Sequence, residues 1–496
     1  MPPLAQRRAF QWCAAAVLSV LLAFPLQPPL TRFPRGLLAD DAYFYVKIAW
    51  NLGRHGMSSF DGIHTTDGYH LLWGWVLGLT SALTGWFTAE PRFHLGAMLW
   101  LYFMVCWAIG IWFGRNWVET LLLFAMGIVF KVMMETTLLA LLLLALCERE
   151  YLAPAPAPRW RWSPLLLVLL PLIRIDAILI GGELVLSPLF TSPDPERRRP
   201  ADRVLAGAGW LALGALLQAG AHFLLFRRWT SVSMELKGFD EASVLDRLRH
   251  NVTGFHGANG VPVILFVLLW GLAILAVLPR PKPERARHLA VLAAPAVFVL
   301  FHLAANNTIN YWYFVPAAYL HAWYFLRFGP EASTRLGWAG RAAIAAVPLL
   351  FIAKWALDGR IRDREIRWAR QFVGEVRRRV APDEPIFQMD ASGWVGWFSG
   401  RQVVNGDGLV NDHDYARRLS ERRLAGYLKE QGIRYIVQNL YPENGMLIGD
   451  CGGLTVSMDS VETLVPPPPG FPDLSAFGLY RLKDRDATGA LISPPP

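Results

Sequence analysis

Charged residues and cysteines are both scarce in this chain. Asp, Glu, Lys and Arg make up only 18% of its 496 residues, less than a soluble protein of this length would carry. There are four cysteines, too few for a disulfide framework, and Cys13, Cys106 and Cys147 lie in apolar runs. Apolar runs of about 20 residues recur over the first 357 positions, which is the length that crosses a bilayer as a helix. The sequence therefore predicts a polytopic membrane protein.

We expect about eleven transmembrane helices. They lie near 11–30, 94–114, 117–131, 136–150, 163–174, 176–190, 204–226, 261–279, 288–305, 311–327 and 341–357. The stretch 70–88 is also apolar, and we expect it to lie in the membrane surface without crossing.

Orientation follows from basic residues, which stay on the cytoplasmic side of short loops. Four such loops are rich in Arg and Lys, namely 148–162, 197–203, 280–287 and 327–341. All four fall on one side if 163–190 crosses twice and 70–88 does not cross. Counting 70–88 as a span and 163–190 as a single span gives the same final side but puts 148–162 outside. These loops also account for the net charge of +9, which makes nucleic-acid binding a poor interpretation.

In the first topology the N-terminus is cytoplasmic, and the loops 31–69 and 227–260 face outward. Residues 358–496 also face outward, and their pattern changes. A basic amphipathic helix is expected over 361–380 and another helix over 415–431. Short strands are expected at 385–389, 402–405, 433–437 and 478–482. We therefore predict two domains: a transmembrane domain over 1–357, and a small external α/β domain over 358–496.

Two adjacent carboxylates, Asp40 and Asp41, stand where the chain leaves its first span. Asp is costly near hydrocarbon, by about 2.5–3.5 kcal/mol at a helix centre. Apolar positions from Tyr43 to Leu52 repeat at helical spacing, so one carboxylate would cap a helix that lies on the membrane. A carboxylate at this boundary can also accept a proton from a hydroxyl group as that hydroxyl attacks. The pattern leaves both roles open.

The block that begins at this pair resembles a known family. It runs Asp40-Asp41-Ala-Tyr-Phe-Tyr, then Ile48-Ala-Trp-Asn-Leu, Phe60-Asp-Gly and Thr66-Asp-Gly-Tyr-His-Leu-Leu-Trp73. It is similar to the first outer loop of GT-C fold glycosyltransferases, more narrowly the polyprenyl-phosphate-sugar-dependent bacterial members that are arabinofuranosyltransferase-like or mannosyltransferase-like. Asp67 stands where those relatives have Asn, and Leu71 where they have Pro. Weaker matches follow in order at Met134-Glu-Thr, Arg174-Ile-Asp, Val232 to Lys237, Trp312 to Pro316 and Asp407-Gly-Leu.

The resemblance implies a membrane enzyme of the bacterial inner membrane whose active site faces the periplasm. It would move a sugar from a polyprenyl phosphate to a lipid, glycan or protein acceptor, with inversion. Asp40 or Asp41 would be the general base, with Asp40 favoured because it comes first. Lys237 and Arg174, with Lys47 behind them, would neutralise the leaving phosphate. Glu135 would hold a second acceptor hydroxyl or a divalent metal, and His70, Trp73 and Tyr313 would contact substrate.

Each of these assignments has a structural alternative. Lys237 would be a surface lysine whose stem lies along apolar surface, Arg174 would pair internally with Asp176, and Glu135 would favour a helix N-terminus. Trp73 and Tyr313 would belong to an interfacial aromatic belt. The metal-like cluster of the outer loop matches no zinc spacing; it consists of His55, Asp61, His64, Asp67 and His70.

Two other functions compete with the enzyme. A transporter or flippase of lipid-linked sugars would favour internal repeats and charges at mid-span, whereas this chain shows no repeat and gathers its acids at the outer boundary. A scaffold that binds envelope glycolipid without turnover would tolerate loss of the acidic pair, which an enzyme would not.

Overall fold

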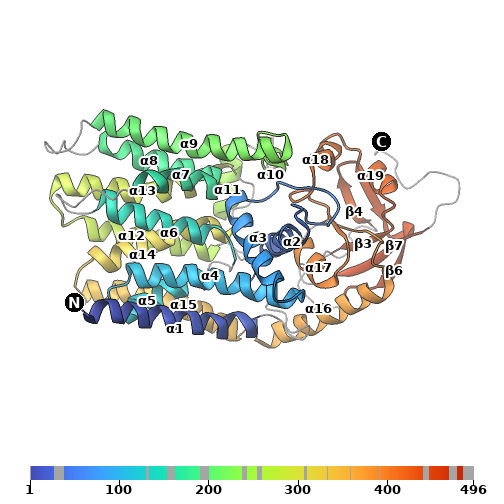
Figure 1. The fold of residues 1–496 in the computed structure, drawn as a ribbon, viewed down its shortest axis with the longest axis horizontal. Coiled ribbons are helices and arrows are strands. Elements are labelled where there is room, and N and C mark those ends of the chain that lie inside the picture. Colours follow the sequence, from blue (N-terminus) through green and yellow to red (C-terminus); the bar gives the residue numbers. More distant parts are fainter. Residues whose placement is uncertain are drawn as a thin grey trace.

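The computed structural model is mostly helical, with a small sheet near its C-terminal end. Figure 1 shows long helices side by side along the long axis, and an α/β part at one end of them. The structure describes residues 2–26, 38, 40–129, 133–152, 162–189, 200–236, 243–253, 260–305, 310–331, 333–357, 359–389, 391–438, 446–468 and 477–483.

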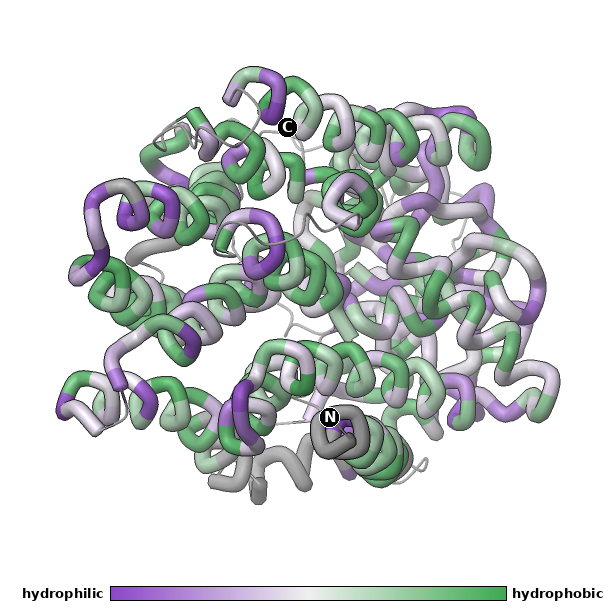
Figure 2. The backbone as a smooth tube through the Cα atoms, turned by 60° about the vertical axis from the view of Figure 1, so that its left-hand side comes forward, coloured by the Kyte–Doolittle hydropathy of each residue, from purple (hydrophilic) through white to green (hydrophobic). Residues whose placement is uncertain are grey.

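Fifteen helices precede position 358 in the described residues. They are α1 (Pro2–Leu26), α2 (Asp40–His55), α3 (Leu71–Gly85), α4 (Pro91–Phe113), α5 (Trp117–Val129), α6 (Thr136–Leu146), α7 (Ser163–Ile173), α8 (Ile178–Leu186), α9 (Pro200–Phe226), α10 (Val232–Leu236), α11 (Val244–Thr253), α12 (Gly260–Val277), α13 (Lys282–Ala305), α14 (Val315–Phe328) and α15 (Arg335–Leu357). Hydrophobic residues follow these helices, and hydrophilic residues gather at their ends (Figure 2). The expected helices are therefore confirmed as helices.

Three helices among the described residues are long and apolar enough to cross a membrane, and they lie within α4, α9 and α13. The shorter apolar helices lie within α1, α3, α5, α7 and α12. The count of about eleven spans, and the side each loop faces, stay predictions. The arrangement is compatible with them, because α2 and α3 lie together between the long helices and the α/β part (Figure 1).

The long helices alternate in direction. At one end, Arg115, between α4 and α5, donates a hydrogen bond to the carbonyl of Leu326 near the end of α14. Arg341, near the start of α15, donates to the carbonyl of Pro330 over 2.7 Å. The start of α6 and the end of α7 meet at the opposite end, where Arg174 pairs with Glu135. Successive helices thus form antiparallel hairpins whose polar turns gather at the two ends.

The C-terminal part holds four helices and a mixed sheet. The helices are α16 (Gly359–Arg379), α17 (Ser392–Ser399), α18 (His413–Ser420) and α19 (Leu424–Glu430). The strands are β1 (Ile386–Gln388), β2 (Val403–Asn405), β3 (Tyr435–Gln438), β4 (Met446–Cys451), β5 (Leu454–Ser457), β6 (Val461–Val465) and β7 (Gly478–Leu482). One sheet has the order β2-β1-β3-β7-β6, with the first three strands parallel, and β4 and β5 form a separate hairpin.

Two expectations for this part need correction. The helix expected over 415–431 is two helices, α18 and α19, because the chain turns between them where Arg422 has a φ of 59°. The sequence also gave no expectation for α17, whose residues Ser392–Ser399 are too few to show a helical period. The four expected strands and the helix over 361–380 are confirmed to within a few residues.

The first outer loop joins the two parts directly. Asp40 lies in the first turn of α2, but its carboxylate accepts hydrogen bonds from the backbone N–H groups of Gly393 (2.8 Å) and Trp394 (2.9 Å). These groups belong to the first turn of α17, where N–H donors have no partner within the helix. Asp40, one of the two carboxylates expected to cap α2, therefore caps α17.

A second close approach lies beside Asp67. A Cβ atom on Gly68 would stand 1.7 Å from the carbonyl oxygen of Leu409, in the loop between β2 and α18. Only glycine allows the two backbones to lie this close.

Gly68→Ala should therefore separate the first outer loop from the α/β part. We expect faster limited proteolysis of the C-terminal part and a lower melting temperature. Gly209→Ala is the matched control, because a Cβ atom there meets nothing within 4 Å. Equal melting temperatures for the two variants would contradict the close approach.

Candidate functional site

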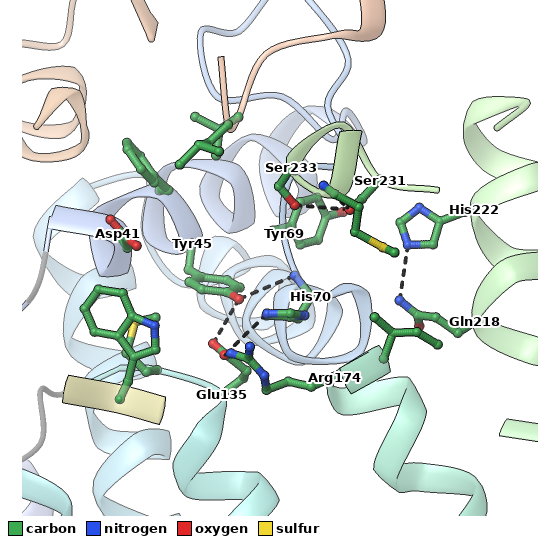
Figure 3. Close-up of a pocket in the computed structure, with 18 of the residues that line it drawn as sticks. Asp41, Tyr45, Tyr69, His70, Glu135, Arg174, Gln218, His222, Ser231 and Ser233 are labelled. Carbon is green, nitrogen blue, oxygen red and sulfur yellow. Dashed lines mark hydrogen bonds and ion pairs between the residues drawn. The ribbon is translucent and has the colours of Figure 1, made fainter. Parts of the chain in front are cut away.

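A pocket lies where the long helices meet the α/β part (Figure 3). The first outer loop, the turns at the helix ends and the loop after β2 all contribute to its wall. Its lining includes Asp41, Phe44, Tyr45, Gly68, Tyr69, His70, Met134, Glu135, Arg174, Ile175, Gln218, Ala219, His222, Trp229, Ser231, Ser233, Met234, Trp312, Tyr313, Leu409 and Val410. The pocket therefore gathers residues from every region that the sequence singled out.

Glu135 and Arg174 form a buried ion pair at this wall. Tyr45 of α2 donates a hydrogen bond of 2.9 Å to Oε2 of Glu135. His70 Nε2 lies 3.5 Å from Oε1 of the same carboxylate. Burial, with the charge of Glu135 adding to it, raises the pKa of the Tyr45 hydroxyl well above its usual value, so this group is a neutral donor. Glu135 is thus held by three side chains, in keeping with the cost of a buried unpaired charge.

Arg174 is shared between two acids. Its Nε and Nη2 donate to Asp176 over 2.9 and 2.6 Å, and His302 lies 2.9 Å from the same carboxylate. The guanidinium group also lies over the ring of Tyr313, 4.9 Å from its centroid. Arg174 stands in an extended conformation between α7 and the turn before α8, which points its side chain at the pocket. Among the described lining residues it is the one Arg or Lys.

The two adjacent carboxylates point to different places. Asp41 lines the pocket (Figure 3). Asp40 is not among the lining residues, and each of its carboxylate oxygens accepts a backbone hydrogen bond from α17. Successive residues of a helix point about 100° apart, so only one of a neighbouring pair can face the pocket squarely. The geometry therefore favours Asp41 over Asp40 for chemistry.

Asp67 is a buried centre of hydrogen bonds between three elements. Its Oδ1 accepts from the N–H of Val232 at 2.9 Å, and its Oδ2 lies 3.2 Å from both His222 Nδ1 and His413 Nε2. His413 Nδ1 lies 3.0 Å from Glu235. Burial alone would raise the pKa of Asp67, but the hydrogen bonds from His222, His413 and Val232 outweigh it and lower the pKa to about 2. Asp67 is therefore charged at neutral pH.

Other residues named from the sequence lie elsewhere. Trp73 is buried and donates to the carbonyl of Met133 over 2.9 Å, away from the pocket lining. Lys47 is also absent from the lining, and burial lowers its pKa although Asp61 acts in the opposite direction. Tyr313, His70 and Glu135 do lie at the pocket. Lys237 lies outside the described residues.

The metal-like cluster of the outer loop is dispersed. His64 pairs with Asp61 over 2.6 Å, and Asp61 also accepts from the N–H groups of Ile63 and His64, which is a local turn. His70 lies at Glu135, and Asp67 at His222. In the part of the chain that the structure describes, no three His, Cys, Asp or Glu side chains are grouped to hold a metal.

No role was predicted from the sequence for Gln218, His222 or His413. Gln218 and His222 are one turn apart near the end of the apolar helix α9, and each is buried. A polar pair at this spacing in an apolar span is a signal for an internal site. His413, by contrast, follows Asp412 in a polar stretch and carries no such signal.

Comparison with known proteins does not assign a family. No protein-family model matches the chain, and no curated protein matches it. Among solved structures, ArnT from Cupriavidus metallidurans, in its crystal structure bound to undecaprenyl phosphate, is similar over 98% of this chain and 99% of that chain. The two share 12% sequence identity with a TM-score of 0.47. At this identity and TM-score, the likeness establishes neither a shared family nor a shared activity.

The contact of His413 with Asp67 predicts a pH-dependent junction. Its hydrogen bond to Asp67 raises the pKa of His413 against the effect of burial. A raised pKa means that the pair stabilises the protein fully below about pH 6.5 and less as pH rises through the folded-state pKa. Protease resistance of the C-terminal part should therefore fall as the pH rises above about 6.5.

His413→Gln isolates this contribution, because the Asp61–His64 pair titrates equally in both proteins. The variant should lose the pair's stabilisation, roughly 1 kcal/mol or less, at low pH and match the parent at high pH. Parallel pH profiles for the parent and the variant would contradict this assignment.

Proposed function

We propose that this protein is an integral-membrane glycosyltransferase of the GT-C class, which moves a sugar from a polyprenyl phosphate to an acceptor on the outer face of the membrane. The observation that carries the proposal is the pocket in which Asp41 and Arg174 both stand, at the end of the helices that the charge pattern assigns to the outer face. The motif block from Asp40 to Trp73 supports the same class.

The proposed reaction is a single displacement at the anomeric carbon. The acceptor oxygen forms a bond to that carbon while the bond from the carbon to the phosphate oxygen breaks. The hydroxyl proton passes to the Asp41 carboxylate, and the electron pair of the broken bond stays on the polyprenyl phosphate. Attack from the opposite side inverts the sugar. A general base of this kind contributes about 10²–10⁴-fold.

The leaving phosphate needs positive charge as it departs. Arg174 alone does not supply a net positive charge, because Glu135 and Asp176 both pair with it. His70 contacts Glu135 and His302 contacts Asp176, so a proton on either imidazole would offset part of the excess negative charge. Lys237 follows α10, whose residues Ser233 and Met234 line the pocket. We propose Lys237 as the second cation, with Arg174 ordering the wall.

The donor can be identified without knowing the acceptor. A strain that lacks the protein should accumulate one polyprenyl-phospho-sugar, which mass spectrometry of its lipid extract would name. Loss of a transporter would instead leave the sugar lipid on the inner side, where periodate added to intact spheroplasts does not reach it. Lipid extracts of intact and lysed spheroplasts after periodate treatment therefore separate the enzyme from the transporter. A lipid profile unchanged by deletion would count against the enzyme.

The acidic pair should split into two roles. Asp41→Asn should lower turnover by about 10²–10⁴-fold, because the proposed general base is lost. Asp40→Asn should mainly reduce stability, by about 1–2 kcal/mol, because it weakens the cap of α17. Purified variants would be compared by transfer from farnesyl-phosphoryl sugars and by thermal unfolding.

The two variants control for each other, since they make the same chemical change one residue apart. Full activity in both would refute the displacement proposed here. An inactive but stable Asp40→Asn beside an active Asp41→Asn would exchange the roles.

Lys237 should act on the donor. Lys237→Ala should raise the apparent KM for donor and lower kcat together, because one charge serves the bound phosphate and the departing one. Lys237→Arg should restore part of the loss, since the charge is kept. Lys282→Ala is the control, because Lys282 is an exposed lysine far from the pocket. It lies at the start of α13, and His302, which contacts Asp176, lies near the opposite end of that helix. Unchanged donor kinetics in Lys237→Ala would leave Lys237 as a surface lysine.

A further inference from the structure

One wall of the pocket is polar without an Asp, Glu, Lys or Arg side chain among its described lining residues. It is formed by Gln218 and His222 of α9 and by Ser231 and Ser233 around the start of α10 (Figure 3). The serine hydroxyl groups lie 3.1 Å apart, and Gln218 Nε2 lies 3.1 Å from His222 Nε2. The side chains of Gln218 and His222 are each more than nine-tenths buried. The wall therefore differs in kind from the charged wall at Glu135 and Arg174.

The hydrogen bonds fix where the protons lie. The Asp67 carboxylate can only accept, and its Oδ1 already accepts from the N–H of Val232. Its Oδ2 therefore receives the Nδ1–H of His222. The Gln218 Nε2 atom, which lies 3.1 Å from His222 Nε2, can only donate, so His222 Nε2 accepts from it and the ring hydrogen lies on Nδ1. This arrangement turns the amide oxygen of Gln218 away from His222.

That amide oxygen is left without a partner. It is buried, and it accepts no hydrogen bond from any residue in the described part of the chain. A buried polar atom without a hydrogen bond costs free energy, and in a pocket wall a ligand can remove that cost.

We propose that the Gln218 amide oxygen accepts a hydrogen bond from a sugar hydroxyl group, and that Asp67, acting through His222, holds the amide in the orientation that allows it. The inference rests on the proposed function, which supplies the sugar. Of the groups in a polyprenyl-phospho-sugar, the hydroxyl is the one that can donate, because the phosphodiester carries no proton at neutral pH. The site is therefore a sugar subsite and not a second phosphate site.

The C-terminal part supports this subsite from behind. His413 of α18 donates from Nε2 to the same oxygen of Asp67 that accepts from His222, and its other nitrogen lies 3.0 Å from Glu235. Gln218 is thus the binding residue, whereas Asp67 and His413 are positioning residues. His413 thus links α18 both to Asp67 and to Glu235 of α10.

Binding measurements on the purified full-length protein test the assignment of Gln218. The probes are farnesyl phosphate and its mannosyl and arabinofuranosyl diesters. Gln218→Met should weaken binding of the preferred diester about 5-fold, the value of one neutral hydrogen bond, and leave farnesyl phosphate unchanged. His64→Gln is the control. Like His222, His64 pairs with an Asp of the first outer loop, in this case Asp61, but it does not line the pocket.

The outcomes separate the two possible sources of the hydroxyl group. Weaker diester binding assigns the hydroxyl to the donor sugar. Unchanged diester binding with a raised acceptor KM assigns it to the acceptor. Equal weakening of farnesyl phosphate, or no change in either substrate, overturns the subsite. A parent protein that shows neither a preference for any glycosyl diester nor transfer would instead refute the proposed function.

The positioning role has a readout that needs no substrate. In Asp67→Asn, the side-chain oxygen stays on the N–H of Val232, so the new amide donates to Nδ1 of His222. His222 should then change to the Nε2–H tautomer, which nitrogen-15 spectra of histidine-labelled protein detect, with His222→Gln identifying the signal. The amide of Gln218 would turn round and lose its acceptor face.

Asp67→Asn should accordingly weaken diester binding as much as Gln218→Met, and the double variant should bind no more weakly than either. An Asp67→Asn protein in which His222 keeps the Nδ1–H tautomer would overturn the positioning role, whatever the transfer assay shows.

Discussion

The burial of Arg174 is the constraint on which the pocket depends. A guanidinium group removed from water must be paired, and here it holds Glu135 before α6 and Asp176 before α8 at the same time. Tyr313 covers its face. Four helix ends therefore meet at one charged group, since α7 ends directly before it and α14 begins directly after Tyr313. Removing Arg174 would leave the buried Glu135 and the half-buried Asp176 without the cation that pairs with both.

The first outer loop connects the helices around the pocket to the C-terminal part. Asp40 completes the hydrogen bonds of α17, and Asp67 joins α9, α10 and α18. Both are acids that meet donors, backbone N–H groups in one case and imidazoles in the other, so each junction gains more from charge-assisted hydrogen bonds than neutral side chains would give. A carboxylate can accept from two histidines and a backbone N–H together, whereas an amide would have to donate to at least one of them.

Much of the fold was accessible from the sequence, and the reasons are local. Apolar runs predicted the long helices, and the period of 3.6 residues from Tyr43 to Leu52 predicted α2. Strand positions such as 433–437 followed from β-branched and aromatic residues. The helix α17 did not, because its cap comes from a residue more than 350 positions earlier. The break between α18 and α19 depends on one residue with a positive φ, which no period reveals.

In the candidate site, too, local patterns revealed some residues, whereas others depend on contacts that are distant in the sequence. Composition and motif located Asp40, Asp41, Glu135 and Arg174, but the order of two adjacent acids could not decide which one faces the pocket. Chain order favoured Asp40, and the position of α17 reverses that preference. The spacing of Gln218 and His222 in α9 is a sequence signal for an internal site, but only the fold brings His222 beside Asp67.

A pocket with one charged wall and one neutral polar wall suits a glycosyl phosphate for an electrostatic reason. Negative charge grows on the phosphate as the sugar leaves, so the cations must act there and not on the sugar hydroxyls. An interaction with a sugar hydroxyl that is equally strong in the ground state and the transition state aids binding but does not raise kcat. A neutral amide fixed by a buried His–Asp pair can select hydroxyl geometry in this way. In the proposed reaction, recognition of the sugar would fall to α9 and α10, and proton transfer to Asp41 in the first turn of α2.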